Sequence, residues 1–214
     1  MEQLTINKNI TEINFKEEWR ELNLVIHADG LGKVRDLVAL LPVIKKLNLK
    51  FFLNGAMKEN YEAVQILSSL GVYSGIVINI KADWEKLTDL MYYALCGRVP
   101  HAPIEPFQYV YDMYQRYILV DYGVVYSGKP AGVLGCIDSC LNAEAQEVSQ
   151  GAQSDETDKS WQRFFYEPTP CAACAGWRIC LGKYQSLKDK SGCQKFTNEW
   201  LNLIENLKFK IKNS

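Results

Sequence analysis

Residues 22–30 read Leu-Asn-Leu-Val-Ile-His-Ala-Asp-Gly, an apolar run that closes on three turn-forming residues. We expect a strand that ends at His27 and a turn over the last three residues. Two further apolar runs follow at residues 51–53 and 75–80. Because these runs alternate little between apolar and polar residues, they are typical of strands that are covered on both faces of a parallel sheet.

Helical patterns lie between the predicted strands. Residues 34–47 carry apolar side chains on one helical face, and Pro42 is expected to kink or divide that helix. Residues 61–70 form a second apolar stripe that ends at Gly71, and Asp83 is placed to cap a third helix. The alternation predicts right-handed βαβ units, too few to close an eight-stranded barrel. The fold class is therefore α/β, with a partial, barrel-like parallel sheet.

The alternation of predicted strands and helices stops after residue 96. Residues 97–106 contain three prolines and read as a surface connection, and residues 117–126 read as two strands around an Asp-Tyr-Gly turn. Residues 196–207 mark an amphipathic helix near the C-terminus. We predict a domain over residues 1–116 and a second module over residues 117–214.

The composition excludes several classes of function. Lys and Arg number 24 and Asp and Glu number 25, so no net field favours nucleic acid or an anionic membrane. No apolar run approaches the length of a membrane span, and the first residues lack the pattern of a signal peptide. We expect a cytoplasmic protein.

Four of the seven cysteines lie close together in the sequence. Cys171, Cys174 and Cys180 form the spacing C-x₂-C-x₅-C, and Cys193 follows. A reducing cytosol and an odd number of cysteines disfavour a disulfide framework. Four thiolates suit either Zn²⁺ or an iron–sulfur cluster, and the single C-x₂-C pair is unusual for structural zinc. Unrelated buried thiols are the remaining alternative.

Residues 117–138 and 160–184 together resemble the SPASM domain, the auxiliary-cluster module of radical SAM enzymes that modify peptides and proteins. The resemblance includes a hairpin, a glycine-rich turn and the C-x₂-C-x₅-C spacing. It implies a C-terminal module that binds one [4Fe-4S] cluster, with the ligands Cys171, Cys174, Cys180 and Cys193.

Two departures from the family pattern limit the number of clusters. Ser127 and Tyr184 stand where the family has cysteines that ligate another auxiliary cluster, so the resemblance implies that this cluster is absent. Cys136 and Cys140 fit neither role. We expect them to be buried thiols, with replacement ligands as the alternative.

In the first half of the chain, the order of a strand, a helix, Phe-Phe-Leu-Asn-Gly at residues 51–55, a helix, Ser-Leu-Gly at residues 69–71 and a strand is similar, more weakly, to the second to fourth strands of the radical SAM barrel. The motif C-x₃-C-x₂-C, which chelates S-adenosylmethionine through an open iron in that family, is absent, and no cysteine precedes Cys96. We therefore expect no bound S-adenosylmethionine and no independent catalysis. The resemblance implies an accessory partner of a radical SAM enzyme, which binds a substrate peptide or relays electrons. The alternatives are a zinc-stabilised interaction scaffold and, less favoured, an enzyme that uses Cys136 and Cys140.

Other polar residues are assigned structural roles. We expect Asp29 to cap the helix that follows it and His27 to satisfy a turn, although residues at a strand's carboxyl end also serve as catalytic or metal-binding groups. We expect His101 and Glu105 to lie in an ordinary surface loop. No residue is predicted to be catalytic.

Overall fold

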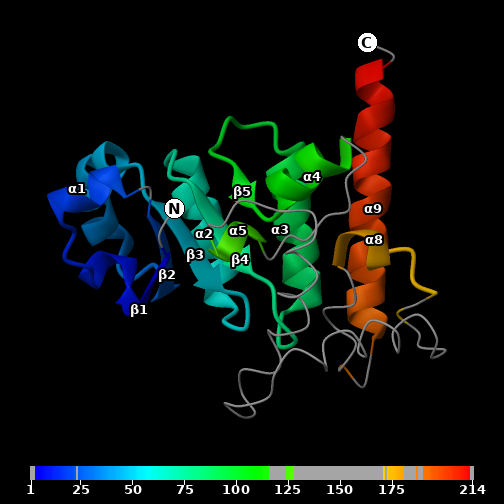
Figure 1. Ribbon diagram of the computed structural model, residues 1–214, viewed down its shortest axis with the longest axis horizontal. Coiled ribbons are helices and arrows are strands. Elements are labelled where there is room, and N and C mark those ends of the chain that lie inside the picture. Colours follow the sequence, from blue (N-terminus) through cyan, green and yellow to red (C-terminus); the bar gives the residue numbers. More distant parts are fainter. Residues whose placement is uncertain are drawn as a thin grey trace, which may run out of the picture. The chain divides into compact units, whose positions relative to one another are not determined.

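A five-stranded parallel sheet, with strand order β1-β2-β3-β4-β5, organises the first half of the chain. The computed structural model describes residues 3–22, 24–115, 124–127, 171, 173–180, 187 and 190–212. The strands are β1 (Gln3–Asn9), β2 (Val25–Gly30), β3 (Lys50–Asn54), β4 (Ser74–Val77) and β5 (Ile104–Glu105). The predicted α/β class and parallel sheet are confirmed (Figure 1).

Helices connect the strands and continue the chain beyond the sheet. Their bounds are η1 (Ile10–Glu12), η2 (Glu17–Glu21), α1 (Val34–Leu47), α2 (Glu59–Ser69), α3 (Trp84–Cys96), α4 (Phe107–Gln115), α5 (Val124–Ser127), α8 (Trp177–Cys180) and α9 (Ser191–Lys212). Each strand lies beside its predecessor, so right-handed connections place α1, α2 and α3 on one face of the sheet. The α9 helix confirms the predicted C-terminal helix.

The chain divides into two compact units. One comprises Met1–Tyr109 with Val125–Lys129, and the other comprises Val110–Val124 with Pro130–Ser214. The predicted boundary between residues 116 and 117 lies outside the described residues. The first unit thus includes a short segment from the second half of the sequence.

Local patterns predicted the middle of the sheet unit well. Fully buried Phe51 and Leu53 form the core of β3, and Gly71 follows α2 with a φ of 77°. The Asp83 carboxylate accepts a hydrogen bond from the Lys86 backbone N–H at 3.3 Å, which confirms the predicted cap of α3. These features depend on neighbours in the sequence, so the sequence alone indicates them.

The predicted turn at residues 28–30 is wrong, because these residues complete β2. Ala28 pairs with Ile6 and Gly30 pairs with Asn9, so the missed strand β1 extends the sheet at this point. Beyond β2, Gly32 has a φ of 81°, a backbone conformation that favours glycine. The strand predicted at residues 75–80 is shorter in the structure, because β4 ends at Val77.

Pro42 does not divide α1, which is continuous from Val34 to Leu47. The proline removes the hydrogen bond that the carbonyl group of Val38 would accept. Both residues are exposed, so water can bind this carbonyl group and the helix continues. Leu37 is buried, whereas Val38 is exposed. The buried apolar face of α1 is therefore narrower than the sequence pattern predicts.

The proline-rich connection is only partly on the surface. Ile104 and Glu105 form β5 beside β4, and Glu105 is 5% exposed. The Glu105 carboxylate accepts hydrogen bonds from the Tyr73 hydroxyl group and, at 2.9 Å, from the Tyr109 backbone N–H. Glu105 is therefore a buried, hydrogen-bonded residue of the sheet, and its prediction as a surface-loop residue is wrong.

The prediction of strands over residues 117–126 is wrong at its end, because Val124–Ser127 form the helix α5. Residues 117–123 lie outside the described residues. Tyr126 makes tertiary contacts that a local pattern cannot reveal. Its hydroxyl group donates to the Ile76 carbonyl group at 3.0 Å and accepts from the Ile78 N–H at 3.2 Å.

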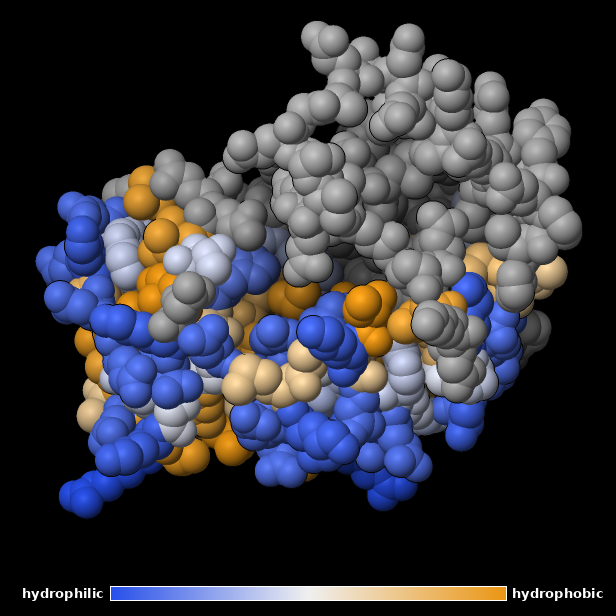
Figure 2. Space-filling view, turned by 90° about the horizontal axis from the view of Figure 1, so that it is seen from below, coloured by the Kyte–Doolittle hydropathy of each residue, from blue (hydrophilic) through white to orange (hydrophobic). Residues whose placement is uncertain are grey.

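Figure 2 shows one face of the molecule, on which the hydrophobic residues form several separate patches between hydrophilic ones. Among the described residues, the large apolar side chains that are exposed include Val34, Val38 and Val99. No helix in the described part of the chain has both the length and the apolar character needed to cross a membrane.

Candidate functional site

A row of side chains crosses the sheet on the face opposite its helices. Backbone register aligns Thr5 with His27, His27 with Phe52, Phe52 with Gly75, and Gly75 with Glu105. The alternate residues of the strands, such as Ile26 and Phe51, are fully buried. The row places the polar side chains of Thr5, His27 and Glu105 on the face opposite α1, α2 and α3.

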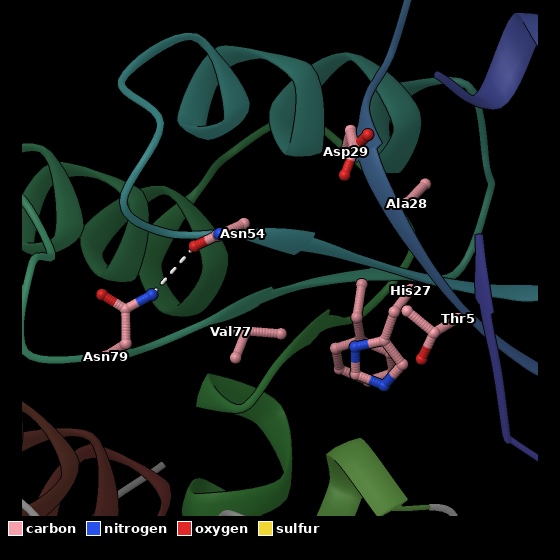
Figure 3. A pocket seen from close by; sticks show the side chains of 8 residues that line it. Thr5, His27, Ala28, Asp29, Asn54, Val77 and Asn79 are labelled. Atoms are coloured by element: carbon pink, nitrogen blue, oxygen red, sulfur yellow. Dashed lines mark hydrogen bonds between the residues drawn. The ribbon is translucent and has the colours of Figure 1, made fainter. Parts of the chain in front are cut away.

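A cavity of about 290 Å³ lies where this face meets the carboxyl ends of the strands. It is lined by Thr5, His27, Ala28, Asp29, Phe52, Asn54, Val77 and Asn79. Figure 3 shows His27 and Thr5 on one side, the hydrogen-bonded pair Asn54 and Asn79 on the other, and Asp29 beside β2. The carboxyl ends of parallel strands are the usual position of ligand sites in α/β folds.

His27 is held in a defined orientation. Its Nε2 atom lies 2.9 Å from the carbonyl oxygen of Tyr126, and its ring stacks on Phe52 with the ring centroids 5.6 Å apart. A carbonyl oxygen only accepts, so Nε2 carries the proton and Nδ1 is the acceptor when the ring is neutral. The predicted role in a turn is wrong, because His27 lies within β2.

The other cavity groups offer both donors and acceptors. The Asn54 Oδ1 atom accepts from the Ala56 backbone N–H at 2.9 Å and from the Asn79 side-chain amide at 2.8 Å. This arrangement leaves the Asn54 NH₂ group as a donor. Asp29 is exposed and lies in β2, whereas Lys33 occupies the N-cap of α1, so the predicted capping role is wrong. The cavity suits hydrogen bonding to a polar ligand.

Sequence reasoning missed Asn54 and Asn79. Asn54 belongs to an Asn-Gly pair that indicated only a turn, and Asn79 lies in an apolar run. The available signal was the position of both residues after predicted parallel strands, whose carboxyl ends meet at one edge of a sheet.

The cysteines that the sequence singled out lie in the second unit. Cys171 and Cys174 lie in the turn before α8, Cys180 ends α8, and Cys193 lies in the first turn of α9. Cys171, Cys180 and Cys193 are buried, and Cys174 is half-buried. Cys136 and Cys140 lie outside the described residues.

The turn that carries Cys171 and Cys174 packs closely against α9. The Cys174 N–H donates to the Cys171 carbonyl group at 3.1 Å, and the Trp177 N–H donates to the Cys174 carbonyl group at 3.0 Å. A Cβ atom on Gly176 would lie 2.1 Å from the Oγ1 atom of Thr197, so this position requires glycine. The turn and the helix are thereby fixed close to each other.

Three of the four thiols share one electrostatic environment. Burial, followed by the charges of Cys171 and Cys174, raises the pKa of the Cys193 thiol to about 11, and Lys190 opposes this shift. Burial also raises the pKa of Cys171, which Lys190 lowers and Cys174 raises further. In the described part of the chain, no three His, Cys, Asp or Glu side chains are arranged to hold a metal ion. One thiolate charge acts on another over a longer distance than the 2.3 Å of a metal–thiolate bond. The pKa shifts therefore indicate that these cysteines lie near one another, but not that their sulfur atoms are arranged as metal ligands.

No protein-family model, curated protein or solved structure matches this chain.

Proposed function

We propose that this protein is a non-catalytic accessory partner of a radical SAM enzyme in peptide or protein modification. In this proposal, residues 117–214 form a SPASM-like module in which Cys171, Cys174, Cys180 and Cys193 bind one [4Fe-4S] cluster. The observation that carries the proposal is the close packing of the turn with Cys171 and Cys174 against α9, which has Cys193 in its first turn. These thiols come from a turn and a helix that Gly176 and Thr197 hold in close contact.

The protonation of the thiols bears on metal binding. Burial raises the pKa of Cys171 and Cys193, so both thiols are protonated at neutral pH when no cation is bound. Metal ions replace such protons, because thiolates are the binding form. A bound cluster would supply one-electron transfer, which is the chemistry required of a relay. The four thiolates would leave no open coordination site for a substrate.

The sheet unit supports the second part of the proposal, the partial barrel that binds a peptide. Its strands follow one another in sequence order, as in a segment of a (β/α) barrel. Its polar face ends in a cavity that offers the His27 Nδ1 atom, the Asp29 carboxylate and the Asn54 NH₂ group. A peptide presents both N–H and carbonyl groups, so it can pair with all three.

The alternative is a zinc-stabilised interaction scaffold. The turn at Cys171 and Cys174, closed by a backbone hydrogen bond and packed on a helix that carries another buried cysteine, also suits a structural zinc site. In this alternative the second unit has no redox role, and the protein acts by binding alone.

Metal content and colour decide between these proposals. We expect anaerobically purified protein to contain about four iron and four sulfide per chain, with a brown absorption that dithionite bleaches. Cys174→Ala should lose the metal, whereas the matched control Cys96→Ala, at an exposed cysteine of the first unit, should keep it. One zinc in a colourless protein would support the alternative. Metal-free protein after anaerobic reconstitution, or equal metal content in both variants, would refute both proposals for these cysteines.

A further inference from the structure

A buried amide oxygen at the start of α2 lacks a partner. Asn60 has 0% exposure, and its Nδ2 atom donates to the carbonyl groups of Asp29 at 2.8 Å and Asn54 at 3.0 Å. Both acceptors are carbonyl oxygens, so only the NH₂ group can face them and the orientation of the amide is fixed. Its Oδ1 atom is buried and accepts no hydrogen bond within the described part of the chain. Such a group costs about 1–3 kcal/mol unless something binds it.

A second cavity, of about 220 Å³, lies beside Asn60 and is distinct from the cavity at His27. Asn9, Gly30 and Gly32 form part of its lining. A Cβ atom on Gly30 would lie 3.0 Å from the Oδ1 atom of Asn9 and 3.3 Å from the Oδ1 atom of Asn60. The two amide oxygens therefore both lie close to Gly30, where no side chain separates them.

The charges at this cavity favour a cation. Glu59 and Glu62 also line it, both are exposed, and both lie in the first turn of α2, where they offset the positive end of the helix dipole. Glu62 makes an ion pair with Lys86 at 3.7 Å, whereas Glu59 has none among the described residues. The lining contains no Lys, Arg or His. Amide and carboxylate oxygens are the ligands of hard cations.

We propose that this cavity binds a calcium ion through the Oδ1 atoms of Asn60 and Asn9, with the carboxylate of Glu59 and water as further ligands. Ca²⁺ accepts six to eight oxygen ligands in flexible geometry, whereas Mg²⁺ requires near-octahedral geometry and retains its waters. Two protein amides and an exposed carboxylate fit the first ion better.

The proposed ion would stabilise the neighbouring cavity through Asn60. The NH₂ group of Asn60 binds the backbone carbonyl groups of Asp29 and Asn54, and both residues line the cavity at His27. Fixing the amide would therefore fix the carboxyl ends of β2 and β3. This inference does not depend on the cysteines.

Calcium titration of the metal-stripped full chain tests the proposal. We expect one Ca²⁺ per chain by calorimetry, a higher melting temperature, and NMR shifts at the amides of Gly30 and Asn60. Gly30→Ala preserves every oxygen ligand but fills the space between them, and Glu59→Gln removes one charge. Both variants should weaken binding by roughly tenfold, equivalent to about 1.4 kcal/mol. Glu85→Gln, an exposed first-turn glutamate of α3, should leave the affinity unchanged.

Three results would overturn the proposal. The first is no binding up to about 10 mM Ca²⁺, a concentration above the range of weak protein calcium sites. The second is equal binding of Mg²⁺, which indicates general attraction to carboxylates. The third is Ca²⁺ binding that neither Gly30→Ala nor Glu59→Gln weakens. Circular dichroism of both variants must show native folding, and unchanged Ca²⁺ affinity in Cys174→Ala separates this site from any cluster.

Discussion

Removing the hydroxyl group of Tyr126 should loosen the carboxyl end of β4. The Tyr126→Phe variant keeps the aromatic ring, which packs edge-on against Phe52 with centroids 5.4 Å apart. It loses the hydrogen bonds to the Ile76 carbonyl group and from the Ile78 N–H. Ile78 is 6% exposed, so its N–H group would lose its partner with little access to water.

The expected loss of stability is about 2 kcal/mol. A net contribution of about 1 kcal/mol for each of two hydrogen bonds gives this value, and the penalty for a buried unpaired N–H raises it toward about 3 kcal/mol. For a unit of this size, about 2 kcal/mol corresponds to a melting temperature roughly 8 °C lower. Thermal denaturation followed by circular dichroism measures the shift.

Hydrogen exchange locates the effect. In the wild type the Ile78 amide should exchange slowly, and Tyr126→Phe should accelerate its exchange more than that of amides in α2. Tyr92→Phe, at an exposed tyrosine of α3, is the matched control and should change neither quantity. Wild-type stability together with unchanged exchange at Ile78 would refute the assignment of residues 125–129 to the sheet unit.

Two further changes test the sheet unit. Gly75→Ala should destabilise this unit by about 1–3 kcal/mol in urea denaturation. The reason is that the new Cβ atom would lie 2.6 Å from the Phe52 ring and 2.7 Å from the Glu105 carbonyl oxygen. Wild-type stability of this variant would contradict the register of β3, β4 and β5. Burial raises the pKa of Tyr61 to about 12, so the folded state keeps a proton that the unfolded state loses above its ordinary pKa of 10. Stability that is present below pH 10 should therefore fall between pH 10 and pH 12, and Tyr61→Phe should flatten this decline in pH-dependent melting.

Sequence patterns were informative where structure depends on near neighbours. The helices α2 and α3 and the strand β3 follow from apolar periodicity, from the Asp83 cap and from the turn at Gly71. The strand β1 was missed although Leu4 and Ile6 alternate with polar residues, because its Asn-rich sequence has low strand propensity and its position depends on pairing with β2. Pairing between distant segments is not encoded in a local pattern.

The candidate sites show the same limit. The spacing of the cysteines predicts a group of four thiols, because all four lie within a short stretch of sequence, and the site that they would form stays a prediction. The cavity at His27 combines residues from four strands and the segment beyond β4, and only the sheet order brings them together. Asn60 could not be recognised from sequence at all, since its unpaired oxygen depends on where β2 and β3 end.

Tyr126 connects the fold of the sheet unit with its candidate site. Its carbonyl group holds the His27 ring, its hydroxyl group binds the end of β4, and its ring contacts Phe52. This single residue from the second half of the sequence therefore contacts His27 of β2, Phe52 of β3 and the end of β4. A fragment that stops at residue 116 would lack Tyr126, and its His27 imidazole would lose the acceptor that sets its tautomer. The sheet and the short segment that carries Tyr126 thus belong to one compact unit at this cavity, although the sequence pattern separates them.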